Sequence, residues 1–334
     1  MSVPNPVPAT NGDVYIAPEE RTGEKSVVFF TRDLSPEGLK KAWRRVADAI
    51  KGEKVAIKLH TGEPNGPNII PPSWIKSFME TEAPNATIIE TNTWYHGNRF
   101  ETEDHRKTLE VNGWTEFTNV DIVDAHDRHV LLPVKGGKWF DTMSVGAGMA
   151  QYDSLIVLTH FKGHGMGGFG GSNKNLGIGC ASGHEGKKWI HANEDGAFGI
   201  NGEELHERFT ECTKATVDFF EDSIAFVNVM RNMSVSCDCE GVDAAPVTTP
   251  NVGILASLDI CAIDTACVDL VWAMKDEDNK DLKERIQSRH GLRQLTYMNE
   301  IGLGSMNYTL IDIDNDDAEI TPAEAVAHVV PFEG

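Results

Sequence analysis

The chain has 334 residues, of which 40% are apolar and 24% charged, and its formal net charge is −21 at pH 7. This length can bury a sizeable core, and the composition is typical of a folded protein rather than a disordered one. The acidic balance argues against nucleic acid and anionic membranes as partners, because both require a basic protein surface.

No stretch is long and apolar enough to span a membrane, and the start lacks the basic region and apolar core of a signal peptide. We therefore expect a cytoplasmic protein with a loose N-terminal tail. The six cysteines contain no CxxC pair, which favours free thiols over disulfides in such a chain. The oligomeric state is left open, a homo-oligomer included.

Short apolar runs alternate with segments of helical periodicity along the chain. The runs predict strands at 26–30, 54–59, 86–91, 120–125, 129–134, 154–159, 224–230 and 252–257. Helices are predicted at 35–52, 71–82, 101–112, 203–220, 259–275 and 279–302. Such alternation indicates an α/β fold with mainly parallel sheets and helices on both faces.

We predict two α/β domains, with a soft boundary between about residues 205 and 250. The N-terminal domain would comprise residues 20–230, and the C-terminal domain, residues 231–334, would close a cleft against it. The active site is expected in that cleft.

One segment, residues 160–191, concentrates four histidines, four lysines and many glycines directly after an apolar run. It lacks the spacing of a P-loop and of a dinucleotide-binding GxGxxG turn. Glycines such as Gly168, Gly170 and Gly171 would let a ligand approach the backbone, although a plain turn is the alternative. His160 and His164 have a spacing that a metal ion could use, and a neutral histidine with a lysine would equally suit acid–base chemistry.

Further reactive side chains follow the ends of predicted strands, where open α/β sheets gather their ligands. His60 and Thr61 follow the strand at 54–59, and His126 follows the strand at 120–125. For His126 the alternative is a simple loop pair with the adjacent Asp127. Five cations stand out near these places in an otherwise acidic chain and predict a site for a small anionic metabolite: Lys58, Arg99, Lys162, Lys174 and Lys187.

Cys237 and Cys239 are separated by a single residue, a spacing that allows them to share a metal ion or a cluster. They would need further ligands, and Cys180 and Cys212 are candidates. The alternative is that all four are inert buried thiols.

Several motifs together resemble the bacterial and archaeal family called domain of unknown function 362. They are "NTWYHGNRFETEDHRKTLEVNGW", "HFKGHGMGGFGGSNKNLGIGCAS", "GKKWIH", "CDC" and "NVGILASLDICAIDTACVDLV". Many members of that family carry a ferredoxin-like insert with cysteines for two [4Fe–4S] clusters. Residues 192–211 contain no such cysteine pattern, so we expect no cluster bound in that way.

The order of motifs also resembles, more distantly, the nickel-dependent lactate racemase family. This resemblance implies that His126 and His164 are the two catalytic histidines and that Lys174 anchors a nickel-pincer nucleotide. His191 is near the position of the nickel ligand, with His184 as the competitor. His60 and Gly62 depart from the family's first motif, where an acidic residue and an arginine are expected.

The sequence thus favours an enzyme, a metal- or cofactor-dependent isomerase with racemase-like acid–base chemistry on a small hydroxy acid or similar anion. The expected catalytic residues are His126, His164 and Lys174. The expected cofactor-binding residues are His60, Thr61, Arg99, Gly168, Gly170, Gly171, Lys174 and Lys187. The expected metal ligands are His160, His184, His191, Cys237 and Cys239, and the rival function is an iron–sulfur or metal-binding redox protein that uses the two cysteines.

Overall fold

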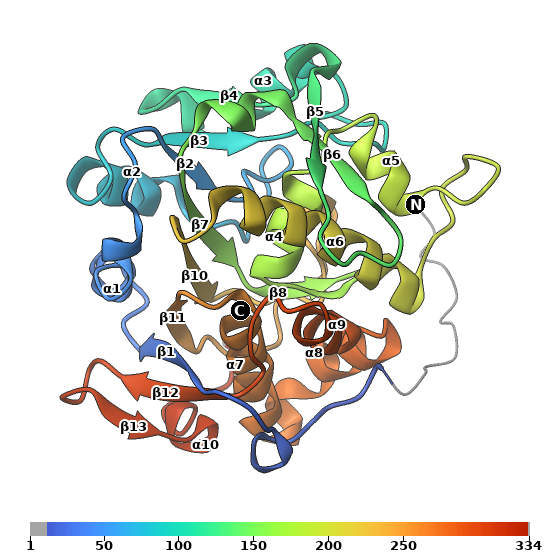
Figure 1. The fold of residues 1–334 in the computed structure, drawn as a ribbon. Coiled ribbons are helices and arrows are strands. Elements are labelled where there is room, and N and C mark those ends of the chain that lie inside the picture. Colours follow the sequence, from blue (N-terminus) through green and yellow to red (C-terminus); the bar gives the residue numbers. More distant parts are fainter. Residues whose placement is uncertain (1–11, 333–334) are drawn as a thin grey trace.

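The computed structural model describes residues 12–332, so most of the expected N-terminal tail lies outside the described residues. A nine-stranded sheet crosses the molecule in the order β13-β12-β1-β11-β10-β7-β2-β3-β4 (Figure 1). Its strands are β1 (Ser26–Thr31), β2 (Val55–Lys58), β3 (Thr87–Glu90), β4 (Val120–Ile122), β7 (Ser154–His160), β10 (Ile224–Met230), β11 (Gly253–Ser257), β12 (Tyr308–Asp312) and β13 (Ala318–Ile320). Two hairpins stand apart from it: β5 (His129–Pro133) with β6 (Thr142–Gly146), and β8 (Lys162–His164) with β9 (Gly168–Gly170).

The sheet is mainly parallel, as predicted. Strands β10, β7, β2, β3 and β4 run parallel to one another, and β1 runs parallel to β12. Strand β11 lies between β1 and β10 and is antiparallel to both. Strand β11, from the predicted C-terminal domain, therefore pairs on both sides with strands of the predicted N-terminal domain. The domain boundary near residue 230 stays a prediction.

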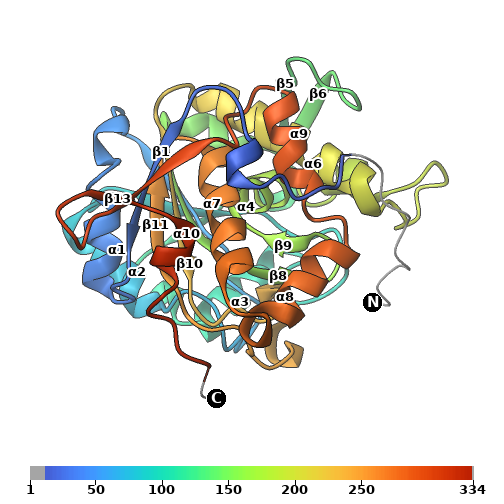
Figure 2. The same cartoon turned by 90° about the horizontal axis from the view of Figure 1, so that it is seen from below.

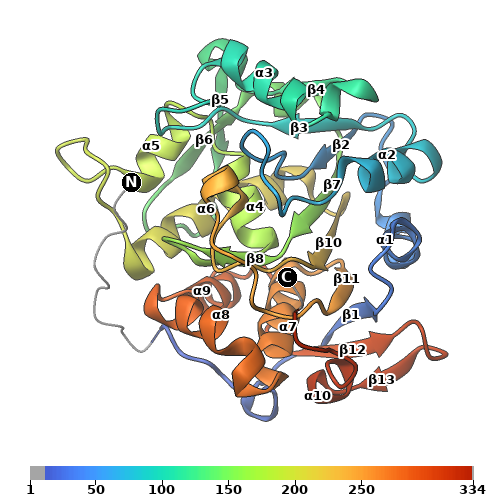
Figure 3. The same ribbon diagram turned by 180° about the vertical axis from the view of Figure 1, so that it is seen from behind.

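Ten α-helices complete the described part of the chain, and they cover both faces of the sheet. They are α1 (Pro36–Trp43), α2 (Pro72–Thr81), α3 (Thr102–Val111), α4 (Ser172–Gly179), α5 (Gly186–His191), α6 (Gly202–Phe220), α7 (Ile260–Ala273), α8 (Asp276–Ser288), α9 (Arg293–Glu300) and α10 (Pro322–Ala325). Figure 2 shows α1 and α2 on one side of the sheet and α4, α6 and α7 on the other. From behind, α3 and β4 lie at one edge of the sheet and β12, β13 and α10 at the other (Figure 3).

Each face of the sheet has its own apolar core, which explains the continuous apolar runs in the sequence. In β7, Leu155 and Val157 belong to the core beneath α4, α6 and α7, whereas Ile156 and Leu158 belong to the core beneath α1 and α2. Successive side chains of a strand point to opposite faces, so a strand covered on both sides must be apolar throughout.

Two predicted helices are wrong in extent. The helix expected at 35–52 begins as predicted, with Ser35 Oγ accepting a hydrogen bond from Gly38 N–H, but it ends at Trp43. Val46 has a non-helical backbone (φ −127°), and Ala47–Ala49 form a separate 3₁₀ turn. The helix expected at 279–302 is two helices, because His290 adopts a left-handed conformation (φ 57°) that a continuous helix does not allow.

Within residues 12–332, none of the helices has both the length and the apolar character that crossing a membrane requires.

Candidate functional site

A cavity of about 570 Å³ opens at the carboxyl ends of parallel strands β2, β3 and β7. Lys58 ends β2 and Glu90 ends β3, while Lys162 and His164 follow β7 in the hairpin β8–β9. Because parallel strands end at the same edge, residues distant in sequence meet there.

Most of the predicted site residues line this cavity. They are Lys58, His60, Arg99, Lys162, His164, Gly170, Gly171, Lys174, Lys187, His191, Cys237 and Cys239. Lys174 lies in α4 and His191 ends α5, so the two helices that follow the hairpin supply one wall.

Other predicted residues are not in the lining. His126 is exposed, has a left-handed backbone (φ 57°), and its backbone N–H donates to Thr102 Oγ1. The structure therefore does not place His126 across the cavity from His164. Thr61 is buried and donates to Glu90, and Gly168 packs on Gly291, whose Cα would lie 2.9 Å from a Cβ at position 168.

Two histidines predicted as metal ligands have both ring nitrogens engaged. His160 places Nδ1 2.9 Å from an Asp238 carboxylate oxygen and Nε2 2.6 Å from the Arg231 carbonyl. His184 places Nδ1 2.6 Å from Asp127 and Nε2 3.2 Å from the Phe100 carbonyl. Neither ring offers a free nitrogen to a metal ion.

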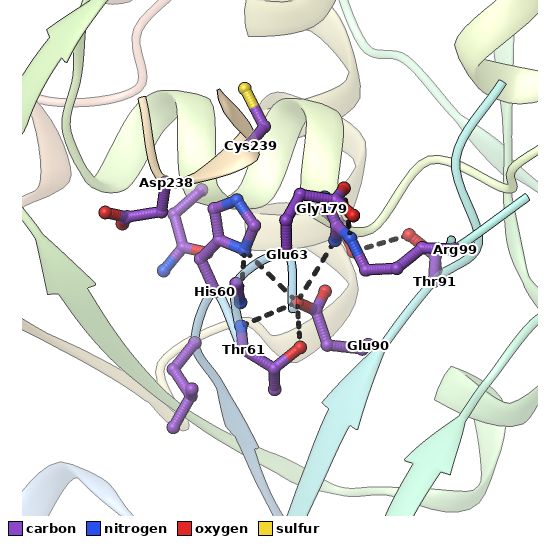
Figure 4. Close-up of polar contacts among 12 residues, drawn as sticks. His60, Thr61, Glu63, Glu90, Thr91, Arg99, Gly179, Asp238 and Cys239 are labelled. Carbon is purple, nitrogen blue, oxygen red and sulfur yellow. Dashed lines mark hydrogen bonds and ion pairs between the residues drawn. The ribbon is translucent and has the colours of Figure 1, made fainter. Parts of the chain in front are cut away.

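Buried charges form the floor of the cavity around the Glu90 carboxylate (Figure 4). Lys58 Nζ donates to it over 2.9 Å, and the N–H and hydroxyl of Thr61 donate over 3.0 and 3.1 Å. His60 and Arg99 lie 3.7 and 3.9 Å away. Burial alone raises the pKa of Glu90, but Lys58, His60 and Arg99 outweigh burial and hold that pKa well below its usual value.

Positive charge outweighs negative charge in the lining. Six lysines and arginines line the cavity, Arg285 being the one that the sequence did not single out, against the acids Glu90, Glu240 and Asp243. Arg99 pairs with Glu63 over 2.8 Å, and Lys162 pairs with Asp238 over 3.0 Å. Among the described residues, no carboxylate forms an ion pair with Lys174. Lys174 therefore has no carboxylate as counter-charge within residues 12–332, although a hydrogen bond from Cys239 and the charge of Lys174 help to hold the pKa of the Cys237 thiol well below its usual value.

Lys187, in α5, is another cation in the lining of the cavity. Its ammonium group donates to Thr91 Oγ1 and to the carbonyls of Asn92 and Ala181. Burial is the largest effect and lowers the pKa of Lys187 to about 8, although the charges of Asp124 and Glu90 act in the opposite direction. Lys187 is therefore charged at neutral pH and becomes neutral in mildly alkaline solution.

The Gly-rich segment is a hairpin followed by a helix, and several of its glycines serve internal packing. A Cβ on Gly163 would lie 2.5 Å from the backbone of Val235, and one on Gly171 would lie 2.5 Å from the Asp264 carboxylate. Asp264, in α7, accepts the N–H groups of Ser172 and Asn173 at the start of α4, each over 2.8 Å. The segment around Asp264 thus contacts the Gly-rich segment and fixes the helix that carries Lys174.

The backbone engages Nδ1 of both His164 and His191, so each ring leaves Nε2 for other partners, but the two rings are opposite tautomers. The N–H groups of Met166 and Gly167 donate to His164 Nδ1 over 3.1 and 2.8 Å, so the neutral ring carries its proton on Nε2. His191 Nδ1 lies 2.8 Å from the Lys187 carbonyl, so this ring carries its proton on Nδ1 and leaves a lone pair on Nε2.

Both rings are uncharged at neutral pH. Burial, followed by the charge of Lys174, lowers the pKa of His164. Burial also lowers the pKa of His191, to about 3. The cavity therefore contains one histidine that donates a hydrogen bond and one that accepts.

The thiols divide into two groups. Cys180 and Cys212 are buried in the apolar core, where burial raises the pKa of each, and they do not join the cysteine pair. Cys237 and Cys239 form a cluster with His164, and their ligand atoms all lie within 4.8 Å of one another. His164 is thus the neighbour of the cysteine pair that sequence reasoning did not assign.

Several residues of the site were missed in the sequence. Glu90 is a charged residue at the end of a predicted strand, and Asp238 is a charged residue between two cysteines. These positions could have identified both residues. Trp94 and Phe198 also line the cavity, but nothing in their sequence context marks them.

Comparisons with known proteins give the following matches. The family model described as "Domain of unknown function (DUF362)" matches residues 55–269. No curated protein matches the chain. Among solved structures, the lactate racemase apoprotein of Thermoanaerobacterium thermosaccharolyticum matches with 14% identity and a TM-score of 0.39, over 90% of this chain and 86% of that one. A Thermotoga maritima protein solved by a structural genomics consortium matches with 12% identity and a TM-score of 0.36, over 59% of this chain and 51% of that one.

Proposed function

Because the chain belongs to the DUF362 family, whose description assigns no reaction, we propose its function from the site: an enzyme that binds an anionic metabolite and moves protons on it. The reaction class is an isomerisation of the racemase or epimerase type. The observation that carries this proposal is the pair of opposite tautomers, His164 and His191, in a cavity with excess positive charge.

The cations would hold the anionic group of the substrate. Lys174 has no carboxylate partner among the described residues, and Lys187 is charged at neutral pH. Arg99 is oriented by Glu63 and Tyr95, whose hydroxyl lies 2.8 Å from Arg99 Nη2. Groups fixed in this way bind an anion without reorganising, which favours both binding and catalysis.

The two histidines would support the proton transfers. His191 Nε2 would take a proton from a carbon next to the anionic group and, as the imidazolium, return a proton to that carbon after exchange with solvent. The neutral His164 would donate a hydrogen bond from Nε2–H to the substrate oxygen that gains negative charge. The negative charge of a bound substrate raises the proton affinity of His191, because an opposite charge stabilises the imidazolium. One neutral ring that accepts a proton and one that donates a hydrogen bond suit a base and an oxyanion stabiliser at the same pH.

The nickel-pincer nucleotide implied by the resemblance to lactate racemase fits part of this site. Lys174 would be its covalent anchor and His191 Nε2 its metal ligand, and both line the cavity. When bound, the group would supply a nickel centre that accepts electrons from the substrate. Intact mass spectrometry after co-expression with the cofactor-synthesis enzymes tests this fit. We expect an added mass on the unaltered protein that is absent from the Lys174→Arg variant.

A second candidate function is metal binding by His164, Cys237 and Cys239, supported by the proximity of their ligand atoms. Soft cations such as Zn²⁺ prefer thiolate and imidazole ligands. However, the hydrogen bonds to His164 Nδ1 place the ring proton on Nε2, and a cation at Nε2 would have to displace it. Metal analysis of the purified protein, with Cys239→Ser as the matched variant, decides between the two: stoichiometric zinc or iron that is lost in the variant favours the metal site.

Exchange of substrate protons with solvent tests the proposed enzyme. The protein is incubated in D₂O with 2-hydroxy and 2-amino acids, and deuterium at the carbon beside the carboxylate is measured by NMR. We expect exchange with at least one acid, its loss in His164→Ala and His191→Ala, and its retention in His126→Ala. Equal exchange in His164→Ala, His191→Ala and the unaltered protein would contradict the proposal.

A further inference from the structure

Three aromatic rings form one wall of the cavity, which we call the aromatic wall: Trp94, His191 and Phe198. Trp94 and Phe198 stack with ring centroids 5.3 Å apart, and Phe198 and His191 stack with centroids 5.0 Å apart. They come from the loop after β3, the end of α5 and the loop between α5 and α6. All three line the cavity.

The aromatic wall is not part of the closed core. Trp94 and His191 are half-buried, and the side chain of Phe198 is 37% exposed. Trp94 and Phe198 belong to neither of the two core clusters. Met166, Ile178 and Leu205 also line the cavity, so its apolar lining extends beyond the wall.

The size of the cavity favours a ligand larger than a three-carbon acid. Cavities of several hundred Å³ hold ligands of drug size, whereas a three-carbon hydroxy acid bound without a nucleotide cofactor would leave most of the 570 Å³ to water. Water in contact with Trp94 and Phe198 is not stabilised by their apolar surfaces. A flat apolar group that displaced this water would be stabilised, because apolar surface on both sides would be removed from water.

We propose that the substrate of this site is an anion that carries an aromatic or similarly flat apolar group. The anionic end binds the lysines and Arg99, and the flat group packs against the aromatic wall. His191 belongs both to this wall and to the proposed proton-transfer pair, so the flat group lies beside the reacting carbon. This inference rests on the proposed function and narrows its substrate class.

Isothermal titration calorimetry with two matched acids tests the inference. DL-lactate and DL-3-phenyllactate share the same hydroxy-acid group and differ only in the phenyl ring. We expect 3-phenyllactate to bind at least about tenfold more tightly, because a stacked and buried ring contributes on that order. Trp94→Ala and Phe198→Ala should each remove most of this difference, and Lys174→Met should weaken the binding of both acids.

Phe100→Ala is the matched control. Phe100 is also partly buried and packs against His96 and His184 in tilted ring pairs, with centroids 4.1 and 4.2 Å away, but it does not line the cavity. Its removal should leave the preference unchanged. Phe198 lies in a loop, so its variant tests the wall even where Trp94→Ala fails to fold.

The outcomes separate the two claims. Equal affinity for both acids overturns the aromatic inference and leaves the proposed anion site intact. Binding of neither acid overturns the proposed function itself. A preference for 3-phenyllactate that persists in both Trp94→Ala and Phe198→Ala also overturns the inference, because the ring would then bind elsewhere.

Discussion

Two clusters of buried charge in this molecule have opposite characters. On the side away from the cavity, the Asp269 carboxylate accepts two hydrogen bonds from Arg21, each of 2.6 Å, and one from each of the hydroxyls of Tyr15 and Tyr308, at 2.9 and 2.6 Å. One anion meets one cation, and the remaining acceptor positions are filled by neutral donors.

The cluster around Glu90 is unbalanced once the adjoining cavity is included. Glu90 contacts Lys58, His60 and Arg99, and Glu63 also pairs with Arg99. The cavity, however, contains further lysines, among them Lys174, which has no carboxylate partner in the described part of the chain. A balanced cluster such as that of Asp269 stabilises the fold and offers nothing to a ligand. A cluster with excess charge beside a cavity marks a place where the missing counter-charge can bind.

The largest expected effect concerns the balanced cluster. Arg21→Met leaves Asp269 buried without its cation, and we expect the free energy of unfolding in urea to fall by about 3–5 kcal/mol. Lys107→Met, which breaks the exposed pair with Asp104, is the control and should cause no measurable change. A loss for Arg21→Met as small as that of the control would show that the cluster does not stabilise the fold.

Glu90→Gln tests the unbalanced cluster and should destabilise less, by about 2–3 kcal/mol. Lys58 keeps its bonds to the Leu59 carbonyl and Asn175, and Arg99 keeps Glu63, so neither cation is left alone. Since the pKa of Glu90 is lowered in the folded state, its contribution is complete above the unfolded pKa of about 4.3 and is lost as the pH falls further. Unfolding curves from pH 7 to pH 3 should therefore converge for the unaltered protein and the variant, and a constant difference would contradict the assignment.

The unpaired cation offers the sharpest contrast with Arg21. Lys174→Met should lower the affinity for 3-phenyllactate about 10- to 100-fold, because it removes a charged hydrogen-bond donor. Its free energy of unfolding should change by less than about 0.5 kcal/mol, because no ion pair of the described residues is broken. A large loss of stability would place Lys174 among the structural charges instead.

The smallest expected effect is the pH dependence contributed by Lys187. Its pKa is lowered to about 8, so its charge is present below pH 8 and lost above it. The affinity for 3-phenyllactate should decline by less than about tenfold between pH 7 and pH 9, since one cation is removed from several. In Lys187→Met the decline in affinity between pH 7 and pH 9 should be absent. If the decline persists in this variant, another group is responsible for it.

The contrast also shows what the sequence could predict. Charged or polar residues at the ends of apolar runs, such as Lys58, His60 and Arg99, are visible because strand ends collect at one edge of a sheet. The Gly-rich segment lines part of the cavity, but Gly163 and Gly171 face Val235 and Asp264, and this packing depends on tertiary neighbours that no local pattern reveals.

Other features of the site depend on backbone geometry alone. The proton positions of His164 and His191 follow from which backbone groups face each ring, and a residue's type does not determine that. Phe198 reaches Trp94 only because the loop between α5 and α6 folds back, and the composition of that loop predicts no particular structure. His126 has the residue type and the strand-end position of a catalytic group, yet its left-handed backbone lies outside the cavity lining.

The most direct test of the account is the proton position on these two rings, measured by long-range ¹H–¹⁵N NMR at pH 7. His164→Gln and His191→Gln identify the two sets of signals. We predict two neutral rings of opposite tautomer, with the proton of His164 on Nε2 and that of His191 on Nδ1. Two rings of the same tautomer, or a charged ring at either position, would contradict the donor–acceptor pair on which the proposed function rests.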